Sequence, residues 1–377
     1  MNRSPSSPER WSEADANAWW AARDWVCGFN FLPSTAVNFL EMWHGDSFDR
    51  PTIERELGWA AEIGYNAVRF NPHFLVWKND RDGFLERLDW MMGVAGQFGM
   101  SSVPCLFDDC GFGGAEPVYG PQPSPVPEVH NSRGVANPGR RAVMDPDVWP
   151  WLERYVRDVT RAFRDDTRIL FWDVYNEPGN RMQFGPDGFS LFQGDLDPHA
   201  LKLMESAFGW MRSEAPEQPL TVGAWSTPLP EHADHVNPYQ TEIDRSALVH
   251  SDVVSFHAYW RAGRVARFID YLSVLDRPMF CTEWMARAVD SRIEDQLHMF
   301  HDRKVGCFQW GLVRGRSQTY LPWPAALVEA HGGRASRSVW FHDVLHEDGT
   351  PYEPDEIGTI RSLARSPGQT QIERTER

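Results

Sequence analysis

The 377-residue sequence lacks an apolar run near the roughly 20 residues that a membrane-spanning helix needs. Its opening stretch, MNRSPSSPERWSEADANAWW, also lacks the apolar core of a secretory signal. Basic residues are scarce, because 37 Lys and Arg stand against 53 Asp and Glu, giving a net charge of −16. Such a surface repels nucleic-acid phosphates and anionic lipid. We therefore expect a cytoplasmic protein that binds neither nucleic acid nor membrane.

Cysteine is also sparse, and the five residues are odd in number and form no CxxC pair. Most of them stand inside apolar runs, which favours buried, reduced thiols over disulfides. No group of His, Cys and carboxylate residues has the spacing of a metal site, and no phosphate-binding loop is present. The sequence therefore predicts neither a metal nor a cofactor. The cysteines are Cys27, Cys105, Cys110, Cys281 and Cys307.

What the sequence does contain is a regular alternation of short apolar runs and amphipathic stretches. The amphipathic stretches include predicted helices at 52–63, 84–98 and 147–163, the first with Thr52 as N-cap and Gly64 at its end. Eight alternations without a Rossmann glycine motif predict an α/β fold, a (β/α)8 TIM barrel. The predicted strands are 25–34, 67–74, 102–109, 169–178, 220–225, 252–260, 278–284 and 304–312.

The barrel is expected to form a single domain over residues 25–365, after a segment at 1–24 that packs on it and before a disordered tail at 366–377. Two long segments interrupt the alternation, at 111–144 after the third strand and at 180–198 after the fourth. Active sites of such barrels lie at the carboxyl ends of the strands. Because long loops are commonly functional, we expect both to form walls of a cleft.

Two predicted strands end in a glutamate. Glu177 stands in Tyr-Asn-Glu-Pro and Glu283 in Cys-Thr-Glu-Trp, and either tetrapeptide alone could be a solvated turn or strand end. On strands four and seven of an eight-stranded ring, however, the two carboxylates can face each other across the mouth. Hydrolysis of a glycosidic bond needs such a pair, about 5–5.5 Å apart for retention of configuration and about 6.5–9.5 Å apart for inversion.

Other side chains are expected at the same face. Arg69, in the second strand, needs carboxylate partners if it is buried and could keep Glu283 ionised. His257 and Tyr259 alternate along the sixth strand and therefore point to the same side. Trp310, near the end of the eighth strand, could form a floor beneath a sugar ring. Each has a structural alternative, such as a core ion pair or a packing side chain, but their shared position at strand ends favours a functional interpretation.

This set of strand-end residues resembles that of the clan A glycoside hydrolases, and most of all the family 5 cellulase-type enzymes and proteins labelled 1,4-β-xylanase. The resemblance implies a retaining enzyme that cleaves β-glycosidic bonds of a neutral oligosaccharide or glycoside by double displacement. It implies that Glu177 is the general acid/base, that Glu283 is the nucleophile, and that Asn176 contacts the sugar 2-hydroxyl. The matching residues are Arg69, Asn176, Glu177, His257, Tyr259, Glu283 and Trp310.

The end of the third strand departs from that family, whose members usually carry a His there. Here residues 107–110 are Phe-Asp-Asp-Cys, which puts the ordinary cellulase subsite in doubt. Asp108 and Asp109 could bind sugar hydroxyls, or one of them could cap the following loop. His130 and Asn131, in the long third loop, could reach the cleft, although a plain polar loop is favoured. Further candidates for stacking on or shaping a sugar subsite are Trp43, Trp225, Trp260, Trp284 and Arg287.

Two other classes of function compete with this interpretation. One is a catalytically silent barrel that binds carbohydrate, although sugar binding alone does not demand two opposed carboxylates. The other is a lyase or aldolase, which commonly needs a Schiff-base Lys or a metal, and no predicted strand end carries a Lys. The lack of a signal favours short saccharides and therefore exo-action or a short cleft. The sequence identifies neither the sugar nor the oligomeric state.

Overall fold

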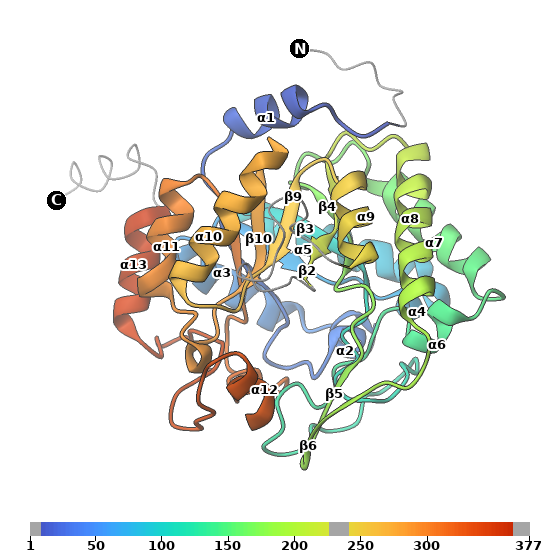
Figure 1. The fold of residues 1–377 in the computed structure, drawn as a ribbon. Helices are drawn as coiled ribbons and strands as arrows, with labels where there is room; N and C mark the ends of the chain where they lie inside the picture. Colours follow the sequence, from blue (N-terminus) through green and yellow to red (C-terminus); the bar gives the residue numbers. More distant parts are fainter. Residues whose placement is uncertain (1–8, 226–240, 365–377) are drawn as a thin grey trace.

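The computed structural model describes residues 9–225 and 241–364 as an α/β barrel (Figure 1). Parallel strands form a central ring in chain order, and helices surround it on the outside. This arrangement confirms the predicted (β/α)8 fold, and all strands except the third are shorter than their predicted runs. The barrel strands are β1 (Cys27–Asn30), β2 (Ala67–Phe70), β3 (Ser101–Asp108), β4 (Trp172–Asn176), β7 (Leu220–Thr221), β8 (Gly223–Ala224), β9 (Val254–His257), β10 (Met279–Trp284) and β11 (Gly306–Trp310).

The fifth position of the ring holds two short strands in place of one. β7 pairs with β4, where Thr221 lies opposite Asp173, and β8 pairs with β9, where Gly223 lies opposite Ser255. Val222 separates the two pieces. Because one piece bonds to each neighbour, the nine strands occupy eight positions and the ring closes through this break.

Helices cover the outside of the ring and shield its apolar surface from water (Figure 1). The longer ones are α3 (Arg50–Ile63), α5 (Arg81–Gln97), α7 (Trp149–Phe163), α8 (Asp197–Ser213), α9 (Glu242–His250), α10 (Ala262–Leu272), α11 (Ile293–Asp302) and α13 (Pro354–Ala364). Helix α1 (Glu13–Ala21) is as long as α9. The shorter helices are α2 (Phe39–Trp43), α4 (Phe74–Asn79), α6 (Arg140–Met144) and α12 (Ala325–Ala330), with 3-10 turns at Ser273–Leu275 and Arg287–Val289.

Helix α3 shows how local sequence sets an element's ends. The predicted N-cap at Thr52 is wrong, because Asp49 accepts the hydrogen bond from the Thr52 N–H at 3.1 Å and the helix begins at Arg50. Glu56 is buried and accepts a hydrogen bond from the Ser34 N–H at 3.1 Å, which connects the helix to the loop after β1. The predicted end is confirmed, since Gly64 takes a left-handed φ of 112°.

The end of the barrel at which the strands begin is covered by α1 (Figure 1). Trp20 of this helix packs on Phe280 with ring centroids 4.8 Å apart, and its Nε1–H donates to the Lys304 carbonyl at 2.9 Å. Residues 1–8 of the predicted N-terminal segment and the predicted tail at 366–377 lie outside the described residues. None of the described helices is both long and apolar enough to cross a membrane.

At the opposite end, the segments after β3 and β4 gather with α2 and α12 (Figure 1). The segment predicted as a plain loop at 180–198 contains a hairpin of β5 (Met182–Gly185) and β6 (Gly188–Leu191). Arg140, which begins α6 after β3, donates to the carbonyls of Asn180 and Met182 at 2.9 Å each. The two long segments are therefore bonded to each other at the carboxyl ends of the strands.

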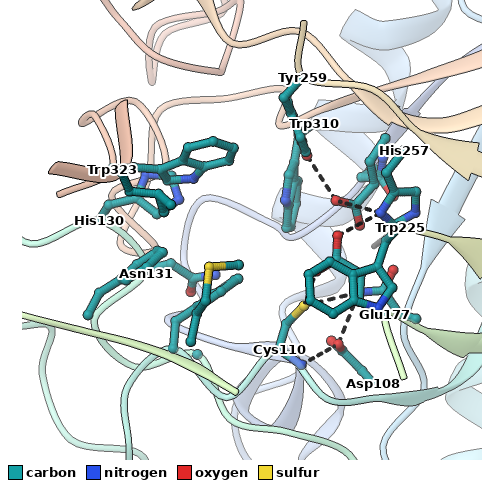
Figure 2. A pocket seen from close by; sticks show the side chains of 18 of the residues that line it. Asp108, Cys110, His130, Asn131, Glu177, Trp225, His257, Tyr259, Trp310 and Trp323 are labelled. Atoms are coloured by element: carbon teal, nitrogen blue, oxygen red, sulfur yellow. Dashed lines mark hydrogen bonds and ion pairs between the residues drawn. The ribbon is translucent and has the colours of Figure 1, made fainter. Parts of the chain in front are cut away.

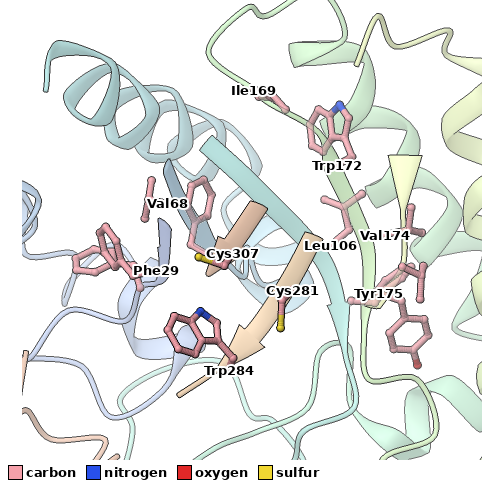
Figure 3. Close-up of a cluster of buried hydrophobic side chains, with 14 of the residues drawn as sticks. Phe29, Val68, Leu106, Ile169, Trp172, Val174, Tyr175, Cys281, Trp284 and Cys307 are labelled. Carbon is pink, nitrogen blue, oxygen red and sulfur yellow. The ribbon is translucent and has the colours of Figure 1, made fainter. Parts of the chain in front are cut away.

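The space between strands and helices is filled by large apolar side chains (Figure 3). Two tryptophans expected to contact a sugar belong to this layer, so those expectations are wrong. Trp43 is fully buried on α2, packs against Phe70 and Phe84, and donates from Nε1 to the Asn71 carbonyl at 2.8 Å. Trp284 packs edge-on against Phe300 of helix α11, with ring centroids 5.0 Å apart. All five cysteines are free, as predicted.

We predict that Trp43→Ala lowers the free energy of unfolding by about 3–5 kcal/mol, because it leaves a cavity in the core. Trp151→Ala is the matched control, since Trp151 is 41% exposed and its loss is expected to cost less than about 1 kcal/mol. Urea denaturation of both variants measures the difference. Equal losses for the two variants would contradict the assignment of Trp43 to the core.

Candidate active site

Two glutamates face each other at the carboxyl ends of the strands. Glu177 directly follows β4 and Glu283 lies in β10, and both are buried. A carboxylate oxygen of one lies within 4.8 Å of a carboxylate oxygen of the other. Glu177 takes a left-handed φ of 45°, a strained conformation for a residue with a side chain. The turn after β4 therefore holds this carboxylate in place at a cost in backbone energy.

Glu283 is surrounded by groups that favour its ionised form. Arg69 Nη1 lies 3.2 Å from Glu283 Oε1, and the Tyr259 hydroxyl donates to Oε2 at 2.9 Å. Burial raises the pKa of Glu283, and nearby Glu177 adds to this, while His257 and Arg69 oppose it. The arrangement stabilises a buried negative charge at Glu283.

Glu177 has a different set of partners. Its Oε2 accepts from Asn180 Nδ2 at 2.7 Å and from the Cys110 thiol at 3.1 Å, and its Oε1 lies 2.7 Å from His257 Nδ1. Burial raises the pKa of Glu177, and the hydrogen bonds from Cys110 and Asn180 oppose the rise. No Lys or Arg of the described residues lies within ion-pair distance of Glu177, and its one basic neighbour at that distance is the His257 ring. Glu177 therefore keeps a proton more readily than a solvated carboxyl does.

The ring of His257 connects the two carboxylates, since its Nδ1 also lies 3.6 Å from Glu283 Oε2. Burial lowers the pKa of His257, which favours the neutral ring. Its Nε2 is buried without a partner among the described residues and faces Gly223, where an added Cβ would come within 2.8 Å. A buried N–H without an acceptor is costly, so the single ring proton belongs on Nδ1, where it is shared with Glu177.

Arg69 is the centre of a buried network that orients this site. It forms hydrogen bonds to Asp173 at 2.9 Å, Asn30 at 2.6 Å and Asn176 at 2.6 Å, and it is 1% exposed. Asn176 accepts from Arg69 through its oxygen and donates from Nδ2 to Asp108 at 3.0 Å. The amide of Asn176 therefore has a defined orientation.

These groups open into a pocket of about 410 Å³ (Figure 2). Trp310 forms one side of it, and Trp225 lies near Glu177, where its Nε1–H donates to the Pro178 carbonyl at 3.1 Å. Aromatic and polar groups alternate around the pocket, as in sites that bind small polar ligands. The predicted residues that line it are Arg69, Asp108, Asn176, Glu177, Trp225, His257, Tyr259, Trp260, Glu283 and Trp310.

Three other candidates have structural roles outside the pocket. Asp109 accepts from the Gly179 N–H at 2.7 Å, which fixes the turn after Glu177, and burial raises its pKa to about 7. Asp109 therefore does not bind sugar and does not cap the loop after β3. The loop-capping alternative applies to Asp108, whose Oδ1 accepts from the Cys110 N–H at 2.8 Å. Arg287 is buried and forms an ion pair with Glu356 of α13. Trp284, described above, also does not line the pocket.

The expectation of a plain polar loop at His130 and Asn131 is wrong, because both side chains are buried and line the pocket. The sequence interpretation also missed Asn30 and Asn71, which line the pocket at the ends of β1 and β2. The rule that identified the glutamates, a polar residue at a strand end, would have found these two. Other residues that it missed are Cys110, Phe112, Met182, Phe184 and Trp323.

A metal ion would find one group of candidate ligands among the described residues, namely Glu177, His257 and Glu283. Their ligand atoms lie within 4.8 Å of one another. The Arg69 guanidinium, 3.2 Å from Glu283, adds a positive charge beside these atoms and repels a divalent cation. The arrangement suits proton transfer and nucleophilic attack better than metal binding.

We predict that Cys110→Ala raises the pKa of Glu177 by up to about one pH unit, because the thiol hydrogen bond stabilises the ionised carboxylate. Carbon NMR titration of the labelled Glu177 side chain measures the change. Cys110→Ser, which keeps a donor, is the control and should leave the titration nearly in place. A lower pKa in Cys110→Ala would contradict the hydrogen-bond direction.

We also predict that Arg69→Met lowers the free energy of unfolding by about 3–5 kcal/mol, because it leaves Asp173 buried without its cation. Arg50→Met removes an exposed pair with Glu86 and is expected to cost less than about 1 kcal/mol. Adding Asp173→Asn to Arg69→Met should restore part of the loss. Denaturant unfolding measures all three, and no recovery in the double variant would argue against an unpaired charge as the cause.

No protein-family model and no curated protein sequence matches the chain. Among solved structures, it is similar to the exo-β-1,4-mannosidase Op5Man5 from Opitutaceae bacterium strain TAV5, with 15% identity and a TM-score of 0.57 over 98% of this chain and 63% of that one. It is also similar to the hyperthermostable endo-1,4-β-D-mannanase from Thermotoga petrophila RKU-1, with 13% identity and a TM-score of 0.55 over 90% of this chain and 99% of that one. A third similar structure is GH5_18 from Streptomyces cattleya, with 18% identity and a TM-score of 0.51 over 94% of this chain and 82% of that one.

The chain thus spans less than two thirds of the length of the first of these proteins. At these identities the likeness shows a shared fold, the (β/α)8 barrel. The names of these neighbours are those of a mannosidase, a mannanase and a GH5_18 protein.

Proposed function

We propose that this protein is a retaining β-glycosidase that acts on a neutral glycoside by double displacement. The observation that carries the proposal is the approach of the Glu177 and Glu283 carboxylate oxygens to within 4.8 Å of each other. An upper limit of 4.8 Å agrees better with the spacing of about 5–5.5 Å in retaining enzymes than with the about 6.5–9.5 Å that gives room for the extra water of an inverting mechanism. The fold and its structural neighbours support the same class of reaction.

In the first step, Glu283 attacks the anomeric carbon and the bond to the leaving oxygen breaks. Arg69 and Tyr259 favour the ionised form of Glu283, which is the form that acts as a nucleophile. Glu177, whose pKa is raised by burial, gives its proton to the leaving oxygen. The products of this step are a free alcohol and a glycosyl ester on Glu283.

In the second step, Glu177 is a carboxylate and takes a proton from water as the water attacks the anomeric carbon. The ester bond to Glu283 breaks, the sugar leaves with its original configuration, and both glutamates return to their starting states. The His257 ring, 2.7 Å from Glu177, can hold that carboxylate in place in either state because its Nδ1 faces it throughout.

The sugar ring is expected to lie on Trp310, whose flat face suits the axial C–H bonds of a pyranose. Asn176, oriented by Arg69 and Asp108, is expected to contact the 2-hydroxyl. Asn71, which donates to Asp108 at 2.9 Å, extends this polar edge. The carboxylates in the pocket and the net charge of −16 favour a neutral over an anionic substrate.

We predict that a 2,4-dinitrophenyl 2-deoxy-2-fluoro-β-glycoside labels Glu283, because fluorine slows both formation and breakdown of the glycosyl ester, whereas the dinitrophenolate leaving group accelerates only its formation. Peptide mass spectrometry locates the label, and proton NMR of the first product from the unfluorinated glycoside should show the β anomer. Glu283→Gln should abolish labelling, and Glu86→Gln, an exposed residue, is the control.

Glu177→Gln is expected to lower the rate on substrates with poor leaving groups by about 10²–10⁴-fold, and to have much less effect on dinitrophenyl glycosides. Initial release of the α anomer would contradict retention. Binding of sugars without turnover of any glycoside would instead support a catalytically silent barrel.

A further inference from the structure

We propose that one end of the pocket is closed by a wall that binds the terminal sugar of the substrate, so that the enzyme removes single sugars from a chain end. The end wall consists of residues 126–134, after β3, and residues 317–323, after β11, with His130 and Asn131 facing the pocket. This inference rests on the proposed function and specifies the kind of glycoside that the site accepts.

The two parts of the end wall are bonded to each other. The Asn131 N–H donates to the Ser317 carbonyl at 2.9 Å, and Gln318 Nε2 donates to the Val129 carbonyl at 3.0 Å. Backbone and side-chain hydrogen bonds between buried groups hold a loop in a defined position. The end wall is therefore a fixed boundary of the pocket and not a pair of independent loops.

The hairpin after β4 supports the end wall from a third side. Phe184 stacks on Phe112 with centroids 4.6 Å apart, and its N–H donates to the Phe112 carbonyl at 2.7 Å. Phe184 also packs edge-on against His130, with centroids 5.9 Å apart. Loops after the third, fourth and eighth barrel positions thus meet at this end of the pocket.

His130 presents a hydrogen-bond acceptor at this boundary. Its Nδ1 lies 2.7 Å from the Leu321 carbonyl, which can only accept, so Nδ1 carries the ring proton. Burial lowers the pKa of His130 to about 4, and the ring is therefore neutral at pH 7. The Nε2 lone pair remains available to a hydroxyl group of the ligand.

Asn131 presents an amide that can both donate and accept. The side chain is 8% exposed, and no hydrogen bond to its amide is found within the described ranges 9–225 and 241–364. Its φ of 45° is left-handed, and its amide lies against Gly134, where an added Cβ would come within 2.9 Å. The amide is therefore open to the pocket, where hydroxyl groups of a ligand can complete its hydrogen bonds.

The end wall lies on the sugar side of the reacting bond. Figure 2 shows His130, Asn131 and Trp323 across the pocket from Glu177 and Trp225. Glu177 protonates the leaving oxygen, so the leaving group lies beside Glu177 and Trp225. Tyr259, which donates to Glu283, packs edge-on against Trp323 of the end wall with ring centroids 5.1 Å apart, so the sugar bound to Glu283 lies beside the end wall. A further sugar beyond this one would meet the wall. The volume of about 410 Å³ is at the lower end of the range of about 300–1,000 Å³ for small-molecule sites.

The test uses 4-nitrophenyl β-glycosides of glucose, mannose, galactose, xylose and N-acetylglucosamine, and then the 4-nitrophenyl glycoside of the β-1,4-linked trisaccharide of the sugar that is cleaved. We expect the first products from the wild-type enzyme, followed by chromatography, to be the free monosaccharide and the nitrophenyl disaccharide. Free disaccharide or free trisaccharide among the first products would overturn the inference while leaving the proposed function intact.

Asn131→Gly removes the amide and suits the left-handed backbone, so it tests recognition without adding strain. We expect its kcat/KM on the preferred nitrophenyl glycoside to fall about tenfold. Gly134→Ala, which pushes the Asn131 amide aside, should give a loss in the same direction. Asn79→Gly, at an exposed position, is the matched control and should change kcat/KM less than twofold.

Calorimetric titration of the five free monosaccharides into wild type and Asn131→Gly tests sugar recognition by the end wall separately from the proposed catalytic function. If no glycoside is cleaved, the proposed function fails, and binding alone decides the inference. Weaker binding of the preferred monosaccharide by Asn131→Gly supports the end wall as its recognition site. Equal binding and equal kcat/KM in the two proteins would overturn it.

Discussion

The buried guanidinium of Arg69 is the constraint on which the rest of the site depends. A cation removed from water is tolerated only when charges and acceptors surround it. Here the acceptors come from β1, β4 and β10, in the form of Asn30, Asp173, Asn176 and Glu283. Satisfying one side chain therefore fixes the relative positions of strands that are far apart in the sequence. The reacting groups are held in defined positions because the buried Arg69 charge requires these partners around it.

The same network gives the two catalytic candidates, Glu177 and Glu283, different electrostatic surroundings although their side chains are chemically identical. Glu283 lies beside the cation, whereas Glu177 is reached by a thiol, an amide and a neutral imidazole. Burial raises the pKa of both groups, so their difference comes from these neighbours and not from solvent exposure. One carboxyl is thereby suited to carry negative charge and the other to carry a proton, which is the asymmetry that acid/base and nucleophile roles require.

Strand-end residues were predictable from the sequence because a parallel barrel brings all carboxyl ends of its strands to one face. This reasoning located Glu177, Glu283 and Arg69 without a structure. It failed for Asp109 and Trp284, although strand alternation predicts that each points away from its pocket-facing neighbour in sequence. The rule that correctly paired His257 with Tyr259 would have excluded both. Trp43 failed for another reason, since its helix α2 directs the ring into the layer outside the strands.

The contribution of the long loops could not be predicted in this way. His130 and Asn131 lie in a segment rich in Pro and Gly, which has no periodicity from which a direction could be inferred. Their position follows from long-range hydrogen bonds to Ser317 and Leu321, nearly two hundred residues later in the chain. Regular elements thus determined the reacting groups, while contacts between irregular segments shaped the space around them.

Gly223, in the divided fifth strand, has a consequence for how the sequence can vary. The absence of a side chain there leaves room for the His257 ring, because a Cβ would come within 2.8 Å of Nε2. The choice of residue at 223 on β8 therefore depends on the residue at 257 on the neighbouring strand β9. Related chains that keep the histidine are expected to keep glycine opposite it, and those that replace the glycine are expected to have changed the histidine as well. Covariation of this pair, more than conservation of either residue, would record the steric requirement.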